Sequence, residues 1–179
     1  MTRPLQNRVL ATGELVATPQ RGTFMGNRGI LHDAHQRLGR PRWRHKAWII
    51  CVLHWKDWHR QVMRPGHYTE LFFLDEAVAL SAGHRPCALC RRPAYNAYRD
   101  AAKIDLPAPA MDDQLHRERA IPRKFSQNRH DAQLDDLPNG AIFWSDQPKL
   151  VWDAHVYSVS ADGYGPPMPR EHGPVSLLT

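Results

Sequence analysis

The chain has 179 residues, of which 24 are Lys or Arg and 18 are Asp or Glu, and its formal net charge is +6. This length suffices for one hydrophobic core, so we expect residues 1–179 to form a single domain. Three cysteines are too few for a disulfide framework, no segment resembles a signal peptide, and no apolar run approaches the roughly 20 residues of a membrane helix. These features argue against a secreted or membrane-spanning protein and predict a cytoplasmic one.

The first third of the chain alternates strand signals with glycine-rich turns. Residues 8–17 predict a β-hairpin, and residues 21–42 are expected to be mostly loop because glycine recurs among polar residues. Residues 47–55 are apolar on both parities, which predicts a central strand with both faces covered. Residues 58–63 are the expected hairpin partner of that strand.

Residues 68–104 predict a strand, a helix, a turn and a second helix. The strand pattern "YTELFFL" leads into Asp75, a good helix N-cap, and the helical pattern "EAVALSA" would end at Gly83. After "PCALC", Pro93 is a favourable first residue for a helix that reaches Ile104. A cysteine pair therefore lies in a turn between two helices.

The last third predicts one more helix and then mostly strands. A short helix is expected in residues 110–120, a polar linker in residues 123–136 and a β-meander in residues 140–165. The proline-rich tail after Gly165 is expected to be irregular. The whole pattern predicts an α+β fold, with β-hairpins and a C-terminal β-meander around the cysteine turn and with two or three helices.

Cys87 and Cys90 have the Cys-x-x-Cys spacing at which two thiolates reach one metal ion. Zinc is the expected cofactor, because thiolates and imidazoles in a closed tetrahedron suit it. A redox pair and two structural free thiols stay open as alternatives. Redox pairs open a helix, however, and here Pro93 begins its helix after Cys90.

The stretch "ELFFLDEAVALSAGHRPCALCRR" resembles the second half of the amino-terminal metal-binding domain of Ada-type DNA alkylation-repair proteins. Those domains carry a Phe-Phe strand, a helix rich in Glu and Ala, and an Arg-Pro-Cys-x-x-Cys-Arg segment. The resemblance covers about residues 68–92 and implies a zinc knuckle and a DNA partner. In that family two earlier cysteines complete the zinc site, and one of them accepts a methyl group from a DNA phosphotriester. This chain has no such pair, which argues against methyl transfer.

Two further ligands are needed to close a tetrahedral site, and the chain offers two histidines in "LHDAH". The predicted ligands of a mainly structural zinc ion are His32, His35, Cys87 and Cys90. Asp33 and His84 are the substitutes to consider. Cys51 lies inside a predicted strand and is expected to be a small core residue.

Basic residues cluster around these motifs and predict an anionic partner, DNA or RNA, although a solvated basic surface is the simpler interpretation. Arginine forks suit phosphate oxygens, and a Trp among cations could stack on a base unless it packs into the core. The candidate nucleic-acid-binding residues are Arg28, Arg42, Trp43, Arg44, Arg85, Arg91 and Arg92.

Other functions stay open, and no catalytic residue is assigned. Pro-Cys-x-x-Cys is one half of the nucleobase deaminase signature, but "HYTE" has one residue too many for the His-x-Glu half. A zinc-dependent hydrolase acting on nucleic acid could use Asp112 and His116 as acid and base, although an exposed helical pair is the simpler interpretation of these two. The last alternative is a metal-stabilised interaction protein.

Overall fold

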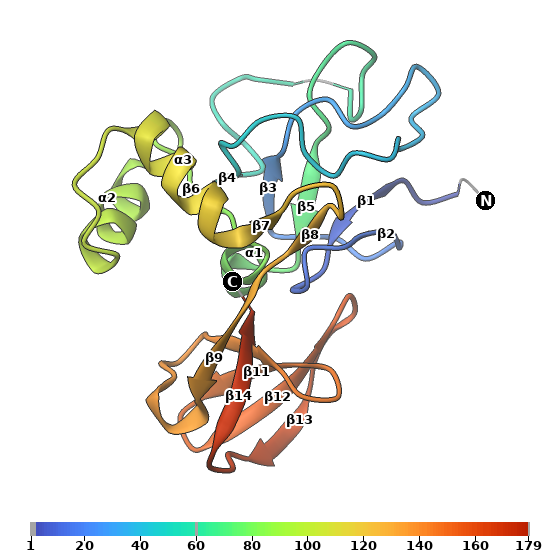
Figure 1. Ribbon diagram of the computed structural model, residues 1–179. Helices are drawn as coiled ribbons and strands as arrows, with labels where there is room; N and C mark the ends of the chain where they lie inside the picture. Colours follow the sequence, from blue (N-terminus) through green and yellow to red (C-terminus); the bar gives the residue numbers. More distant parts are fainter. Residues whose placement is uncertain (1–2, 60, 179) are drawn as a thin grey trace.

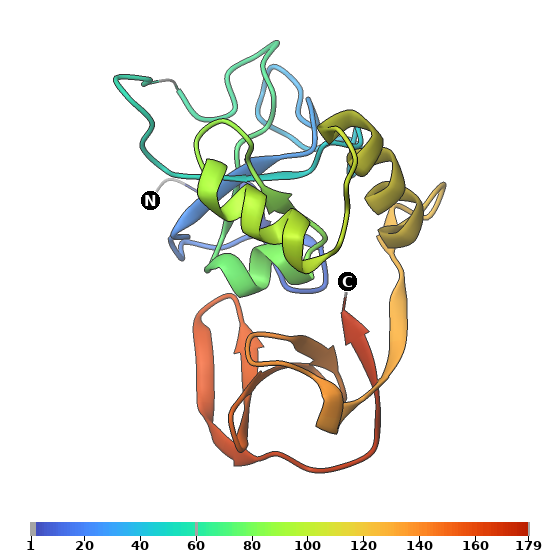
Figure 2. The same ribbon diagram turned by 90° about the vertical axis from the view of Figure 1, so that its left-hand side faces the viewer.

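The computed structural model describes residues 3–59 and 61–178 and has an α+β fold (Figure 1). Within these residues the strands form two six-stranded sheets and a short two-stranded one. Helix α1 (Glu76–Ser81) lies between the two large sheets in both views (Figures 1 and 2). The predicted fold class, with β-hairpins and a C-terminal meander, is confirmed.

The amino-terminal sheet has the strand order β2-β1-β5-β3-β4-β6. Its strands are β1 (Gln6–Val9), β2 (Leu15–Ala17), β3 (Phe24–Asn27), β4 (Ile49–Cys51), β5 (Leu71–Phe73) and β6 (Arg85–Pro86). β1 and β2 form the predicted hairpin, with Gly13 at a φ of +84° in its turn. β6 runs parallel to β4, so the chain returns to this edge of the sheet just before the cysteine turn.

Two sequence predictions about this sheet are wrong. β3 lies in the segment predicted to be loop and is a central strand between β4 and β5. Its Gly26 is needed for close packing, because an added Cβ would lie 2.1 Å from the Ile49 carbonyl oxygen. The expected hairpin partner at residues 58–63 forms no strand in its described residues, because β4 pairs with β3 and β6 instead.

The two faces of this sheet differ in character. One face packs into the core with α1 through a cluster that includes Val9, Ile50, Leu71, Phe73, Ala79 and Ala82. Strand pairing aligns Arg8 with Phe72, Phe72 with Met25, and Met25 with Cys51. Because side chains alternate between faces, these four residues form one row across the opposite face, which we call the cysteine face.

Helices α2 (Arg92–Ala101) and α3 (Ala108–Arg119) lie on the β6 side of the sheet (Figure 1). They share a small core of Tyr95, Ile104 and Met111. The chain then forms the two-stranded sheet of β7 (Ala120–Ile121) and β8 (Ser126–Gln127) before it enters the C-terminal sheet. The helices therefore support the edge strand that precedes the cysteine turn.

The C-terminal sheet has the order β13-β12-β11-β10-β14-β9. Its strands are β9 (Arg129–Gln133), β10 (Ile142–Trp144), β11 (Pro148–Trp152), β12 (His155–Ser160), β13 (Gly163–Pro169) and β14 (Pro174–Leu178), with a 3-10 turn at Leu134–Asp136. Val78 of α1 packs against Ile142 and Val159 of this sheet. The two large sheets thus share a hydrophobic cluster.

The predictions of a polar linker at residues 123–136 and of an irregular tail are also wrong. The linker contains β9, and the tail contains most of β13 and all of β14. The prolines are compatible with strands here because β13 is an edge strand and Pro174 is the first residue of β14. Across the described residues, no helix is both long enough and apolar enough to cross a membrane.

Candidate metal centre

Three cysteines from separate parts of the chain meet at the β4–β6 edge. The ligand atoms of Cys51, Cys87 and Cys90 all lie within 4.8 Å of one another. β6 pairs with β4 in parallel so that Ile50 stands opposite Pro86, and one step further the same register sets Cys51 beside Cys87. The Cys87 N–H donates to the Ile50 carbonyl at 2.9 Å. Strand pairing therefore fixes the distance between these two sulfur atoms.

Cys90 reaches the same point through the turn between β6 and α2. The Arg91 N–H donates to the Cys87 carbonyl at 3.1 Å, which closes a turn immediately before α2 begins. The Leu89 N–H donates to the Cys87 sulfur at 3.4 Å. A backbone donor at sulfur stabilises the thiolate form, which is the form that binds metal.

The thiols differ in burial and in pKa. Cys87 is buried, whereas Cys51 and Cys90 are partly exposed. The hydrogen bond from Cys51 lowers the pKa of Cys87 to about 5. The same hydrogen bond and then burial raise the pKa of Cys51, and burial raises that of Cys90. Thiols bind metal as thiolates, so a metal ion that binds all three sulfur atoms must displace their protons.

The cysteines line a groove of about 800 Å³ that runs along the cysteine face. Charged and aromatic side chains that also line it are Arg3, Arg8, Arg21, His54, Trp55, Trp58, His59, Tyr68, Glu70 and Phe72. In the described part of the chain, no fourth His, Cys, Asp or Glu joins the cysteines within the same 4.8 Å. The arrangement can hold a metal ion with three protein ligands at the wall of an open groove.

Only part of the predicted ligand set comes together. Cys87 and Cys90 belong to the cluster, whereas His32 and His35 do not. His32 is buried elsewhere, with its Nδ1 2.7 Å from the Thr69 hydroxyl. His35 lies in an exposed turn. Cys51, expected to be a core residue, is the third member of the cluster.

The substitute ligands also lie outside the cluster. His84 is buried with its ring centroid 4.6 Å from that of Phe73, and burial with two nearby arginines holds its pKa well below the usual value. Asp33 accepts the backbone N–H of Arg37 at 3.0 Å and closes a surface turn. Both side chains therefore have structural contacts of their own.

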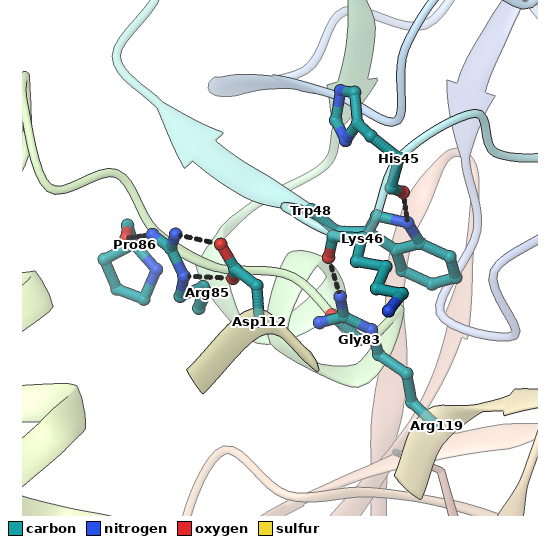
Figure 3. Close-up of polar contacts among 8 residues, drawn as sticks. All are labelled: His45, Lys46, Trp48, Gly83, Arg85, Pro86, Asp112 and Arg119. Carbon is teal, nitrogen blue, oxygen red and sulfur yellow. Dashed lines mark hydrogen bonds and ion pairs between the residues drawn. The ribbon is translucent and has the colours of Figure 1, made fainter. Parts of the chain in front are cut away.

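Among the candidate nucleic-acid-binding residues, Arg28 and Arg85 are buried. Arg28 donates to the carbonyls of Gly13 and Ala82, each at 3.1 Å. Arg85 donates through two nitrogens to the two carboxylate oxygens of Asp112, each at 2.7 Å (Figure 3). Neither guanidinium group faces solvent in this structure.

The other candidates differ in accessibility. The ring of Trp43 is partly buried and contacts the rings of Trp48, His116 and Phe125. Arg42 and Arg91 are partly buried, and Arg91 pairs with Glu76 at 2.7 Å. Arg44 and Arg92 are exposed. Of this set, these two arginines are the most accessible to a phosphate.

Two arginines, Arg28 and Arg119, pack against the ring of Trp48 inside the protein. The Trp48 ring is fully buried, with the guanidinium carbons of Arg28 and Arg119 at 4.2 and 4.4 Å from its centroid. Arg119 also donates to the Gly83 carbonyl (Figure 3). Burial, with neighbouring arginine charges, lowers the pKa of Arg28 to about 9. These cations stabilise the packing of the core by cation–π and hydrogen-bond contacts.

Asp112 and His116 do not form the acid and base pair considered from the sequence. Asp112 is buried against Arg85, as described above. The His116 ring packs 5.5 Å from the ring centroids of Trp43 and Trp48, and burial lowers its pKa. Both residues attach α3 to the sheet, so they are not an exposed helical pair either.

Comparisons of the chain with protein-family models, with curated proteins and with solved structures gave no match. The class of site is therefore defined by its geometry, a candidate metal centre of three cysteines in the wall of a groove. The resemblance to Ada-type domains stays a prediction.

Proposed function

We propose that the protein is a zinc-dependent enzyme that acts on nucleic acid or its components. Cys51, Cys87 and Cys90 would hold the zinc ion, and the groove in whose wall they lie would give water or a substrate access to it. The proposal rests on one observation, the meeting of three cysteines at the wall of a groove of about 800 Å³. Structural zinc sites are closed by four protein ligands, whereas catalytic sites keep one position open.

A zinc ion in this position would supply Lewis acidity for a hydrolytic reaction. The chain contributes the rigid part of the site, because sheet pairing fixes Cys51 and Cys87 while the turn before α2 fixes Cys90. Met25 and Phe72 lie in the same row as Cys51 and give this face an apolar surface beside the cysteines. This arrangement follows from the strand register and differs from the closed, mainly structural zinc site predicted from the sequence.

Cobalt substitution tests whether one coordination position is open. We expect Co²⁺ to give the visible absorption of a tetrahedral thiolate site, and we expect added azide to shift these bands because it can occupy the fourth position. The measurement is an azide titration of the cobalt-loaded protein followed by absorption spectroscopy. Bands that do not respond to azide would mean that the protein itself supplies a fourth ligand.

A structural zinc ion is the second candidate, and one observation favours it. His54 and His59 line the same groove and are exposed, so either ring is a candidate fourth ligand. In that case His54→Ala or His59→Ala would change the cobalt spectrum, and chelation would unfold the protein. With an open site, neither substitution alters the spectrum and most of the fold survives chelation.

Nucleic acid is the proposed partner because the chain has a net charge of +6 and Arg3, Arg8 and Arg21 line the groove. We expect single-stranded oligonucleotides to bind, with an affinity that falls steeply with salt. Three phosphate contacts correspond to a loss of roughly 20-fold between 50 and 200 mM salt. Fluorescence anisotropy at several salt concentrations measures this slope. Binding that is absent at low salt would contradict the choice of partner.

A further inference from the structure

Glu70 is a buried carboxylate in the wall of the groove with one oxygen that lacks a hydrogen-bond donor. Only 2% of the residue is exposed. Its Oε2 accepts the Met63 N–H at 2.6 Å, whereas Oε1 has no hydrogen-bond partner in the described structure. Leaving a buried carboxylate oxygen without a donor is unfavourable. A ligand with an N–H group at this point of the groove would supply the missing donor.

The position of Glu70 limits the size of such a ligand. Gly26 stands opposite Leu71, and the same register sets Glu70 opposite Asn27, on the cysteine face and two strands from Cys51. Strand spacing and rise put the Cα atoms of Glu70 and Cys51 about 12 Å apart. This separation is too long for one water molecule and suits a ring system that reaches Glu70 with one edge and the cysteines with the other.

The far end of the groove is cationic. Arg8 lies in the same row as Phe72, with its guanidinium carbon 4.8 Å from the centre of that ring. Burial and the nearby charge of Arg21 lower the pKa of Arg8. In the described residues neither arginine forms an ion pair with a carboxylate. An anionic group between Arg8 and Arg21 would offset the repulsion between the two positive charges. Its oxygen atoms could also accept hydrogen bonds from the planar guanidinium N–H groups.

We infer that the groove binds a nucleotide whose base carries an amino group, with the amino N–H donating to Glu70 and the phosphate contacting Arg8 and Arg21. Along the cysteine face the arginines come first, then Glu70 and then the cysteines. In a bound nucleotide the phosphate would lie at the arginines, the amino edge of the base at Glu70, and the reacting edge of the base at the cysteines. A carboxylate accepts hydrogen bonds only, so it selects cytosine, adenine or guanine over uracil, whose N–H is flanked by two carbonyl oxygens. The inference rests on the proposed function because the reacting edge lies at the metal.

Calorimetric titration of the zinc-loaded protein with CMP, AMP, GMP and UMP tests the inference. We expect the amino-bearing nucleotides to bind at least about tenfold more tightly than UMP, as one lost hydrogen bond to a charged group implies. Glu70→Gln should reduce this preference to within about twofold, because the amide can also donate to a carbonyl. Arg21→Ala should weaken all four nucleotides by a similar factor, and the control Glu171→Gln, at an exposed position, should change nothing.

The outcomes separate this inference from the proposed function. Wild-type protein with one zinc per chain that binds none of the nucleotides, or binds UMP as well as CMP, would overturn the inference and leave the metal centre standing. Protein without metal would instead contradict the proposed function. The comparison of CMP with UMP needs only the wild type, so it decides the matter even where Glu70→Gln does not fold.

Discussion

Replacing Asp112 with alanine is expected to lower the free energy of unfolding by about 3–5 kcal/mol, which is the usual cost of breaking a buried ion pair from one side. The side chains of Arg85 and Asp112 are only 5% and 8% exposed, and two hydrogen bonds of 2.7 Å join them. The substitution leaves the Arg85 guanidinium buried without its carboxylate. Because Arg85 lies on β6 just before Cys87, the variant should also loosen the cysteine cluster.

Asp113→Ala is the matched control, because it changes the next residue of the same helix. Asp113 pairs with Lys46 at the same distance of 2.7 Å, but its side chain is 50% exposed. An exposed pair adds little stability, so the urea midpoint of this variant should stay close to that of the wild type. Urea denaturation followed by circular dichroism compares the two variants. Equal losses of stability would contradict a special role for the buried pair.

Replacing Cys51 with serine is expected to weaken zinc binding by more than about a hundredfold, as much as replacing Cys87. Loss of a second-sphere partner already costs 10–100-fold in metal affinity, and loss of a direct ligand should cost more. Competition with a chromophoric chelator measures the affinity. His35→Ala is the control, because His35 lies in an exposed turn and should leave the affinity unchanged.

The opposite pattern would support the ligand set predicted from the sequence. If Cys51→Ser bound zinc like the wild type and His35→Ala lost it, the metal would lie between the histidines and the Cys-x-x-Cys turn. The cysteine cluster would then be a packing contact between strands. Circular dichroism of each variant ensures that a lost metal is not the result of an unfolded chain.

The parts of the structure that the sequence predicted well depend on neighbours along the chain. Asp75 caps α1, with its side chain accepting the Val78 N–H at 3.0 Å, as its position before a helical pattern indicates. The Cys-x-x-Cys turn and the helix that follows it are also local, because Pro93 lies in the first turn of α2. Such signals need no knowledge of which strands pair.

The third cysteine depends on tertiary structure and could not be found in this way. Cys51 meets Cys87 only because β4 and β6 pair in parallel, and no local pattern specifies that pairing. The same limit explains the missed strand β3, where Gly26 indicates a loop by composition but in fact permits close strand packing. The position of Arg28 was also missed for this reason. A charged residue beside glycines indicates an exposed loop, whereas in the structure Arg28 is buried against Trp48.

X-ray absorption at the zinc edge of the zinc-loaded protein tests the central claim most directly, because it counts sulfur neighbours. The account predicts three sulfur atoms at about 2.3 Å and one lighter atom at about 2.0–2.1 Å. Two sulfur atoms with two imidazole nitrogens would contradict it and would exclude Cys51 from the metal site.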